Sequence, residues 1–172
     1  VGETYYLVNS SFAHYPGLPV FRSTDMVHWR QIGNAIDRPD QFGFSGLRSS
    51  RGMFAPDISF HAGIFYLVGT CVDCGGNFVM TAQDAAGPWS KPHWLPFEGI
   101  DPSIYWEGER AFIVNNRAPA EPPRYEGHRA IWVQEFDWRA LKMTGTATQI
   151  VNGGVDISHK PSWIEGPHLL RR

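Results

Sequence analysis

The stretch Phe54-Ala-Pro-Asp-Ile-Ser-Phe60, followed by His-Ala-Gly and then Ile64-Phe-Tyr-Leu-Val68, decides the fold. Two short runs rich in β-branched and aromatic residues, separated by a turn that contains glycine, indicate an antiparallel hairpin. The same order returns in Ile100-Asp-Pro-Ser-Ile-Tyr-Trp106, Glu-Gly-Glu and Arg110-Ala-Phe-Ile-Val114. The chain therefore contains a repeated hairpin.

The repeat extends beyond the two hairpins. After the first hairpin come residues 77–82 and then Asp84-Ala-Ala-Gly-Pro-Trp89. After the second come residues 130–136 and then Asp137-Trp138. The start of the chain fits the same template from its second strand onward, and Trp163-Ile-Glu-Gly-Pro-His-Leu169 resembles the first strand of a further unit. The repeat therefore covers the whole sequence.

The length of the repeat indicates the architecture. Tyr6, Tyr66 and Phe112 occupy equivalent places at intervals of about 60 and about 46 residues, and a four-stranded repeat of this length is typical of a β-propeller blade. About three blades fit into the 172 residues, fewer than the four to eight that close a propeller. We expect an all-β chain, with residues 1–172 forming a partial β-propeller domain that lacks the first strand of its first blade and the later blades.

Strand signals dominate, and helical periodicity is almost absent. The best helical candidate, residues 138–143, is only about a turn and a half long. Strands are expected where short runs of β-branched and aromatic residues are bounded by Gly, Pro, Asn or Asp: residues 4–9, 19–22, 57–60, 64–69, 77–82, 103–106, 111–115, 130–136, 146–151 and 162–170.

The composition excludes several classes of protein. Hydrophobic residues make up 42% and charged residues 19%, which suits a packed domain and argues against disorder. The net charge of −2 without a basic cluster argues against nucleic-acid binding, and no apolar run is long enough to cross a membrane. Residues 1–4 do not read as a signal peptide. The compartment, cytoplasmic or secreted from a bacterium, and the oligomeric state stay open.

The two cysteines, Cys71 and Cys74, form a single C-x-x-C sequence. This spacing suits half a zinc site, a redox pair, a disulfide or two free thiols at a turn. No second pair of ligands at similar spacing supports zinc. We therefore expect two thiols at a turn between strands, with no metal and no cofactor.

Three positions of the repeat meet near the expected propeller axis. The first strands of successive units carry Ala55, Asp101 and Glu165 at equivalent places, so two units offer a carboxyl group to one space. Hydrolysis of a glycosidic bond uses such a pair, one carboxylic acid to protonate the leaving oxygen and one carboxylate to activate water or attack. The alternative is structural, with Asp101 opening a turn before Pro102 and Glu165 ending a strand.

The motifs together resemble glycoside hydrolase family 43, and its β-xylosidases and α-L-arabinofuranosidases above all. The strongest are Asp101-Pro-Ser-Ile-Tyr105 and Trp163-Ile-Glu-Gly-Pro-His168. The others, in order, are Tyr5-Tyr-Leu-Val-Asn-Ser-Ser-Phe12, Pro16-Gly17, Ser23-Thr-Asp-Met-Val-His-Trp29, Arg51-Gly-Met-Phe-Ala-Pro56, Gly75-Gly-Asn-Phe78, Asp84-Ala-Ala-Gly-Pro-Trp-Ser90, Tyr125-Glu-Gly-His-Arg-Ala-Ile-Trp132 and Asn152-Gly-Gly-Val-Asp-Ile-Ser158.

The resemblance implies a five-bladed propeller and an exo-acting, inverting glycosidase. Its substrates would be terminal xylose or arabinofuranose residues of xylan-derived oligosaccharides or arabinoxylan. Glu165 would be the general acid, and Asp101 would orient it and raise its pKa. Phe12 and the Phe54-Ala55 pair would line the pocket of the terminal sugar, although family members usually have Trp where this chain has Phe54.

The catalytic base is the main departure from the family. The resemblance places it in an Asp-Pro-Ser-Ile strand upstream of Val1, so this polypeptide is expected to lack it and to be a poor hydrolase alone. Asp25 and Asp84 lie in expected outer turns. Asp57 could face inward, but a structural role is favoured for it.

Three further polar residues have two interpretations each. His168 either tunes the pocket beside the acid or is structural. Arg129 either contacts substrate or, as we slightly prefer, pairs with a surface acid at a strand edge. His128 is expected to be solvated rather than a ligand.

Two other functions compete with the enzyme. A carbohydrate-binding propeller without catalysis would share every motif except the base. An interaction propeller of the kelch or WD40 kind would carry Gly-His and Trp-Asp repeat signatures, which are not found here.

Overall fold

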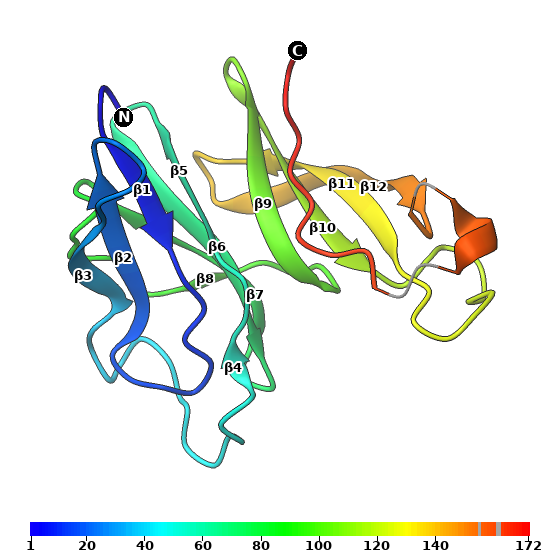
Figure 1. Ribbon diagram of the computed structural model, residues 1–172, viewed down its shortest axis with the longest axis horizontal. Helices are drawn as coiled ribbons and strands as arrows, with labels where there is room; N and C mark the ends of the chain where they lie inside the picture. The colour runs from blue at the N-terminus through cyan, green and yellow to red at the C-terminus, as the bar shows by residue number, and fades with distance from the viewer. Residues whose placement is uncertain (155, 161–162) are drawn as a thin grey trace.

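The computed structural model describes residues 1–154, 156–160 and 163–172, and its regular structure is almost entirely β (Figure 1). Three antiparallel sheets follow one another along the chain. Within the described residues the only helical element is the 3₁₀ turn η1 (Ile157–His159). The prediction of an all-β chain with about three blades is confirmed.

Each sheet is built from consecutive strands. The first contains β1 (Tyr5–Val8), β2 (Gly17–Ser23) and β3 (Arg30–Ile36). The second contains β4 (Gly52–Met53), β5 (Asp57–His61), β6 (Ile64–Val72), β7 (Gly76–Ala82) and β8 (His93–Trp94), with β4 and β5 both paired to β6. The third contains β9 (Ile100–Glu107), β10 (Arg110–Arg117), β11 (Ala130–Asp137) and β12 (Lys142–Asn152).

The middle sheet is buried on both faces. Along β6, Phe65 and Leu67 belong to the apolar core shared with the first sheet, while Tyr66 and Val68 belong to the core shared with the third sheet. Because successive side chains of a strand point to opposite faces, this alternation places one sheet on each side of β6. The sheets are therefore stacked face to face, as blades of a propeller are.

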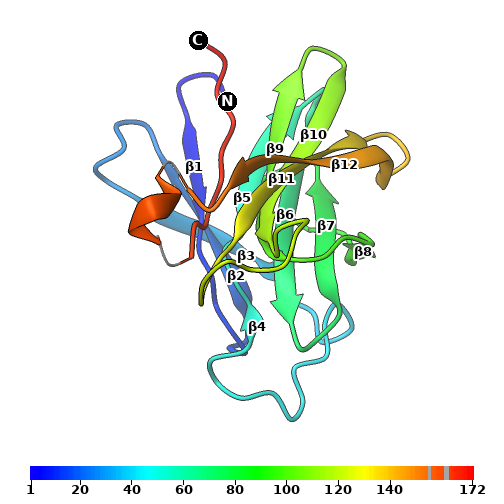
Figure 2. The same ribbon diagram turned by 90° about the vertical axis from the view of Figure 1, so that its right-hand side faces the viewer.

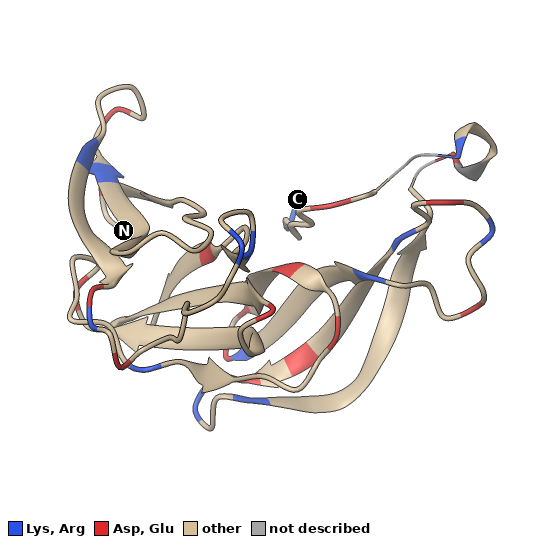
Figure 3. Cartoon of the chain, turned by 90° about the horizontal axis from the view of Figure 1, so that it is seen from below, with Lys and Arg blue, Asp and Glu red and all other residues tan. Residues whose placement is uncertain are grey.

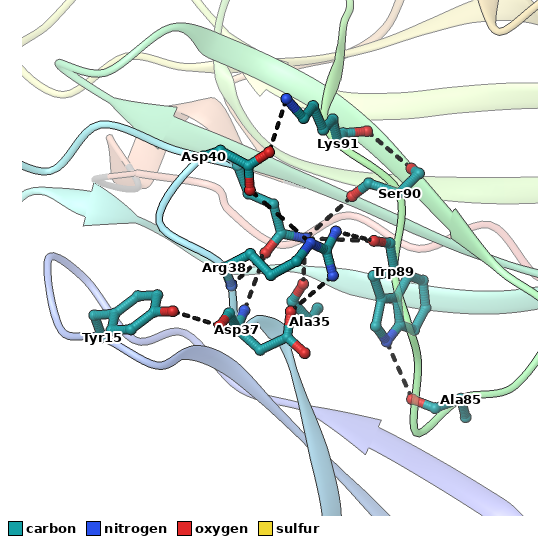
Figure 4. A network of polar contacts seen from close by, with 10 residues as sticks. Tyr15, Ala35, Asp37, Arg38, Asp40, Ala85, Trp89, Ser90 and Lys91 are labelled. Carbon is teal, nitrogen blue, oxygen red and sulfur yellow. Dashed lines mark hydrogen bonds and ion pairs between the residues drawn. The ribbon is translucent and has the colours of Figure 1, made fainter.

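A polar network joins the first sheet to the end of the second (Figure 4). The Gln41 side chain is 4% exposed; its amide nitrogen donates to the carbonyl of Ala35 at 3.1 Å and to that of Ser90 at 3.2 Å. Arg38 donates from Nη2 to the Trp89 carbonyl at 2.6 Å. Since buried carbonyl groups need partners, these bonds fix the segment between β3 and β4 against the second blade.

Most expected strands are confirmed, with three omissions and one error. The omitted strands are β3, which is polar at its start, and β4 and β8, which are only two residues long. The expected strand at 162–170 is wrong in its described residues, 163–170, where no strand is assigned; Ser162 lies outside the described residues. A strand needs a hydrogen-bonded partner, and no strand of the described chain pairs with this segment.

The best helical candidate, residues 138–143, is not helical, in agreement with the expectation of almost no helix. Residues 138–141 form the turn of the β11–β12 hairpin, in which Leu141 has a left-handed φ of 50°, and residues 142–143 begin β12. The Asp137 carboxylate accepts hydrogen bonds from the backbone N–H groups of Arg139 and Ala140. A side chain that bonds nearby N–H groups in this way stabilises a turn instead of a helix.

Cys71 and Cys74 form a disulfide, so the expectation of two free thiols is wrong. Both residues lie at the β6–β7 hairpin, where Asp73 takes a left-handed φ of 63°. The chain reversal brings the two Cα atoms to 5.1 Å, within the usual range for a disulfide.

Charged residues are interspersed along the chain (Figure 3). No group of His, Cys, Asp and Glu suited to hold a metal ion is found among the described residues. Within the same residues, no helix is long and apolar enough to span a membrane.

Candidate active site

Asp101 lies on an irregularity in the third sheet. Ser103 of β9 faces Val114 of β10, whereas Ile100 faces Asn116, so two residues of β9 oppose one residue of β10. This is a β-bulge, a device that re-aims a side chain. Asp101 itself has a left-handed φ of 54°, which Asp tolerates better than most residues.

A glycine, Gly99, is required immediately before β9, the strand that contains the bulge. Gly99 has a φ of 92°, and a Cβ at this position would lie 2.1 Å from the Asn116 carbonyl oxygen. A side chain there would collide with backbone that cannot yield. Gly99 therefore lets the chain approach β10 closely and enter the bulge that presents Asp101.

The Asp101 carboxylate is only partly accessible and has two donors on the same oxygen. Asn116 Nδ2 donates to Oδ2 at 3.0 Å, and the backbone N–H of Gly166 donates to it at 3.4 Å. Burial raises the pKa of Asp101, while Gly166, the Arg129 guanidinium and Asn116 act in the opposite direction. The bond from Gly166 brings the chain immediately after Glu165 to Asp101.

Arg129 is bound to Asn116, the residue that also donates to Asp101. Its Nε and Nη2 atoms donate to Asn116 Oδ1 at 3.0 and 2.8 Å, and Asn116 is completely buried. Burial lowers the pKa of Arg129, while Glu165 and Asp101 act in the opposite direction. Asn116, and not a surface acid, is therefore the hydrogen-bonding partner, and the preferred strand-edge interpretation of Arg129 is wrong.

The segment that carries Glu165 is attached to the third sheet by its backbone (Figures 1 and 2). The Trp163 N–H donates to the Gly127 carbonyl at 3.1 Å, and Ser103 Oγ donates to the Pro167 carbonyl at 2.6 Å. The side chain of Glu165 is exposed. An exposed carboxyl group on a fixed backbone, beside a half-buried one, is an arrangement that can transfer a proton to a bound molecule.

Phe12 and Phe54 form an aromatic pair. Their rings meet edge to face with centroids 5.8 Å apart, and Phe12 is 42% exposed. Reciprocal 3.0 Å hydrogen bonds join the backbones of Phe12 and Met53. A Cβ at Gly52, where φ is 93°, would lie 2.5 Å from the Phe12 carbonyl oxygen, so glycine is needed for this approach. Ala55, next in sequence, is exposed.

A buried polar chain links the aromatic pair to the Asp101 bulge. The Phe54 N–H donates to the Thr70 carbonyl at 3.0 Å, and Thr70 Oγ1 donates to Asn77 Oδ1 at 2.7 Å. Asn77 Nδ2 donates to the carbonyls of Phe97 and Gly99 at 2.8 and 3.1 Å. Neighbouring blades are therefore held in register by hydrogen bonds at the level of the candidate site.

Three buried asparagines that hold the site together, Asn77, Asn115 and Asn116, were not predicted from the sequence. Asn115 is 4% exposed and donates from Nδ2 to the Glu98 carbonyl at 2.7 Å, which supports the loop before Asp101. Asn is depleted in strands and is rarely fully buried. Two consecutive Asn residues at the end of an apolar strand were therefore a signal that could have been used.

His168 acts electrostatically on Asp57. The Ile104 N–H donates to Asp57 Oδ2 at 3.0 Å, which ties β5 to β9. Burial raises the pKa of Asp57, while Ile104 and then the charge of His168 act in the opposite direction. The bond to β9 supports the structural role favoured for Asp57.

His128 is 4% exposed, so the expectation of a solvated side chain is wrong. Its Nδ1 accepts a hydrogen bond from the Arg124 N–H at 3.1 Å, and Nε2 lies 2.8 Å from Asn152 Oδ1. With Nδ1 as acceptor, Nε2 carries the proton and donates to Asn152. The imidazole thus fixes the loop before β11, next to Arg129.

Comparisons with known proteins agree with this arrangement. The sequence profile of glycosyl hydrolases family 43 matches residues 1–172. A xylosidase/arabinosidase of Butyrivibrio fibrisolvens is 44% identical over 99% of this chain and 33% of its own length. A non-reducing-end α-L-arabinofuranosidase of Bacteroides ovatus is 42% identical over 66% of this chain and 22% of its own length.

Solved structures give the same result. A family 43 enzyme retrieved from a capybara gut metagenome superposes with a TM-score of 0.94 at 44% identity, covering 100% of this chain and 33% of that protein. A xylan β-1,4-xylosidase of Bacillus halodurans superposes with a TM-score of 0.85 at 33% identity, with the same coverage. The chain thus spans about a third of the length of these relatives, whose family has the five-bladed propeller fold.

Proposed function

This chain belongs to glycosyl hydrolases family 43, and we propose that it carries the general acid of an exo-acting, inverting glycosidase. The observation that supports this most directly is the hydrogen bond from Gly166 N–H to Asp101 Oδ2, because it places the Glu165 backbone beside a second carboxyl group. Glycosidic bonds are cleaved by such pairs of carboxyl groups.

In this proposal Glu165 protonates the glycosidic oxygen as the bond to the sugar breaks. The acid must reach that oxygen within hydrogen-bonding distance, which an exposed side chain can do. The partner carboxylate that activates water is proposed to come from the part of the whole protein that precedes this chain, as the family resemblance implies. Inversion follows from water attacking the face opposite the leaving oxygen.

Asp101 is proposed to orient the acid and to tune its protonation. Its carboxylate accepts hydrogen bonds from Asn116 and Gly166, which fix its position. The positive charge of Arg129 interacts with the carboxyl groups of both Glu165 and Asp101. A preorganised arrangement of this kind lowers the cost of rearranging charge during proton transfer.

The terminal sugar is proposed to bind at the pair formed by Phe12 and Phe54, with Ala55 leaving room beside it. Aromatic rings offer an apolar surface to the C–H groups of a pentose. The substrates are proposed to be terminal xylose, terminal arabinofuranose or both, from xylan-derived oligosaccharides or arabinoxylan. The names of the relatives, xylosidase/arabinosidase and α-L-arabinofuranosidase, support this range.

A leaving-group series with the complete protein tests the role of Glu165. We expect Glu165→Ala to lower kcat/KM on natural xylosides by about 10²–10⁴-fold, since their leaving oxygen needs a proton. An aryl glycoside of an acidic phenol should lose much less. Glu126→Ala, another exposed glutamate, is the matched control and should leave both activities unchanged.

Equal losses across all leaving groups would remove Glu165 as the acid. If the wild-type protein binds pentose oligosaccharides but hydrolyses none of them, the chain belongs to a carbohydrate-binding propeller instead, and the proposed enzymatic function is wrong.

A further inference from the structure

Trp163 is an aromatic side chain close to the general acid that the proposed mechanism does not use. Its side chain is 53% exposed, although the residue is held by the bond from its N–H to the Gly127 carbonyl. It stands two residues before Glu165 in the segment that passes β9 (Figure 1). A large, exposed indole on a fixed backbone is available to a ligand.

Arg129 contacts this ring and is linked to Asp101 through Asn116. The guanidinium carbon lies 5.1 Å from the centroid of the Trp163 ring, within the range of a cation–π contact. The same guanidinium is bound to Asn116 and feels the charges of Glu165 and Asp101. The contact with Arg129 helps to orient the indole, which is still 53% exposed.

The chemistry of the reaction decides what the exposed indole could receive. The general acid must contact the oxygen that links the terminal sugar to the rest of the substrate. Whatever lies beyond that oxygen is the leaving group. The pair formed by Phe12 and Phe54 belongs to the first and second sheets, whereas Trp163 is attached to the third. Trp163 is therefore a second aromatic surface, separate from that pair and on the same segment as Glu165.

We propose that Trp163 is a specificity-determining residue that stacks on the sugar unit of the leaving group. This inference rests on the proposed function. The expected occupant is a xylopyranose unit, because its hydroxyl groups are equatorial and its two faces present C–H groups to an aromatic ring. Arg129 is the residue that positions the indole.

The test uses the complete protein with two substrates of the same terminal sugar. One is an oligosaccharide that the wild-type protein hydrolyses, such as xylobiose. The other is the corresponding glycosyl fluoride, whose leaving group has no ring to stack. We expect Trp163→Ala to lower kcat/KM on the oligosaccharide about tenfold or more, since an aromatic contact is lost. Activity on the fluoride should stay within about twofold of wild type.

Trp163→Phe retains an aromatic face and should recover most of the activity on the oligosaccharide, which separates stacking from a loss of folding. Trp29→Ala, at an exposed tryptophan on the turn between β2 and β3, is the matched control and should affect neither substrate.

Equal losses on both substrates would overturn the proposal, because the indole would then support the acid or the fold. Full activity of Trp163→Ala on the oligosaccharide would overturn it as well. If the wild-type protein cleaves neither substrate, it is the proposed function that has failed.

Discussion

The second and third blades carry equivalent Xaa-Pro segments that differ in both backbone and side chain: Asp101 has a left-handed φ of 54°, and Ala55 has no positive φ. In the second, Ala55-Pro56 interrupts the strand between β4 and β5, and Asp57 then faces Val68. In the third, Asp101-Pro102 forms the bulge of β9, and Ser103 then faces Val114. One blade presents a methyl group and the other a carboxyl group. The bulge and the carboxyl group are therefore both particular to the third blade.

The next strand of each blade shows a parallel difference. Thr70 and Asn116 occupy equivalent places, two residues beyond Val68 and Val114. Thr70 donates to Asn77 within its own sheet, whereas Asn116 bonds both Asp101 and Arg129. In the second blade, Thr70 therefore forms a hydrogen bond within its own sheet. In the third blade, Asn116 binds two charged side chains, Asp101 and Arg129.

The largest effect is expected from removing the carboxylate of Asp101, which the third blade has where the second blade has Ala55. Asp101→Asn in the complete protein should lower kcat/KM by about 10²-fold or more, as loss of a preorganised charge at an active site does. Steady-state kinetics on a natural xyloside measure this loss. Ala55→Asp together with Asp101→Asn should not restore activity. Recovery in the double variant would show that the two blades are interchangeable.

The same substitution should have the opposite effect on stability. Burial holds the pKa of Asp101 above its ordinary value, so ionisation destabilises the folded protein at neutral pH. This cost is present above the folded-state pKa and disappears as the pH falls below the ordinary value. We expect Asp101→Asn to raise Tm at pH 7 and to lose that advantage near pH 3. An equal Tm difference at both pH values contradicts this assignment.

Substitutions of Asn116 in β10 and of its counterpart Thr70 in β6 should separate effects on activity from effects on stability. Asn116→Ala leaves Arg129 and Asp101 without their shared partner and should destabilise the fold by about 1–3 kcal/mol. It should also lower kcat/KM about tenfold through the displaced charges. Thr70→Val, its counterpart, should reduce stability by about 1 kcal/mol without this loss of activity. Denaturant unfolding measures the stability of both variants, and steady-state kinetics measure their activity. A similar loss of activity in Thr70→Val would contradict the difference proposed between the two residues.

The contact between the two blades should affect stability and leave the chemistry unchanged. Asp57→Ala removes the acceptor of the Ile104 N–H and should cost about 1–3 kcal/mol, whereas Asp57→Asn retains an acceptor and should cost less. Thermal unfolding near neutral pH measures both. A folded Asp57→Asn variant without activity would assign Asp57 a role in catalysis.

The smallest effect is expected at the aromatic wall. Phe54→Trp introduces the residue usual in the family, and the partly exposed ring has room to grow toward the solvent. We expect kcat/KM to change by less than about fivefold, with a shift in the ratio of xyloside to arabinofuranoside hydrolysis. An unchanged ratio would place Phe54 outside the pocket of the terminal sugar.

Two features of the fold, the hairpin repeat and the length of the blades, could be predicted from the sequence alone. These features are local, because alternation of apolar residues and turn glycines set them within each unit. Propensity did not reveal β4 and β8, which are too short to carry a pattern, or the hairpin turn at residues 138–141. The disulfide was one of the alternatives that C-x-x-C spacing left open, and chain reversal at the β6–β7 hairpin decided it.

Only the tertiary structure decided how the candidate site is held together. Asn116, Arg129 and the Glu165 segment lie far apart in the sequence and meet because the third sheet and the chain after it fold onto one another. The burial of His128 depends on Arg124 and Asn152 in the same way. A buried polar residue takes whichever partner the packed backbone brings to it, since leaving it unpaired is costly. That choice is made by contacts between strands, which no local pattern encodes.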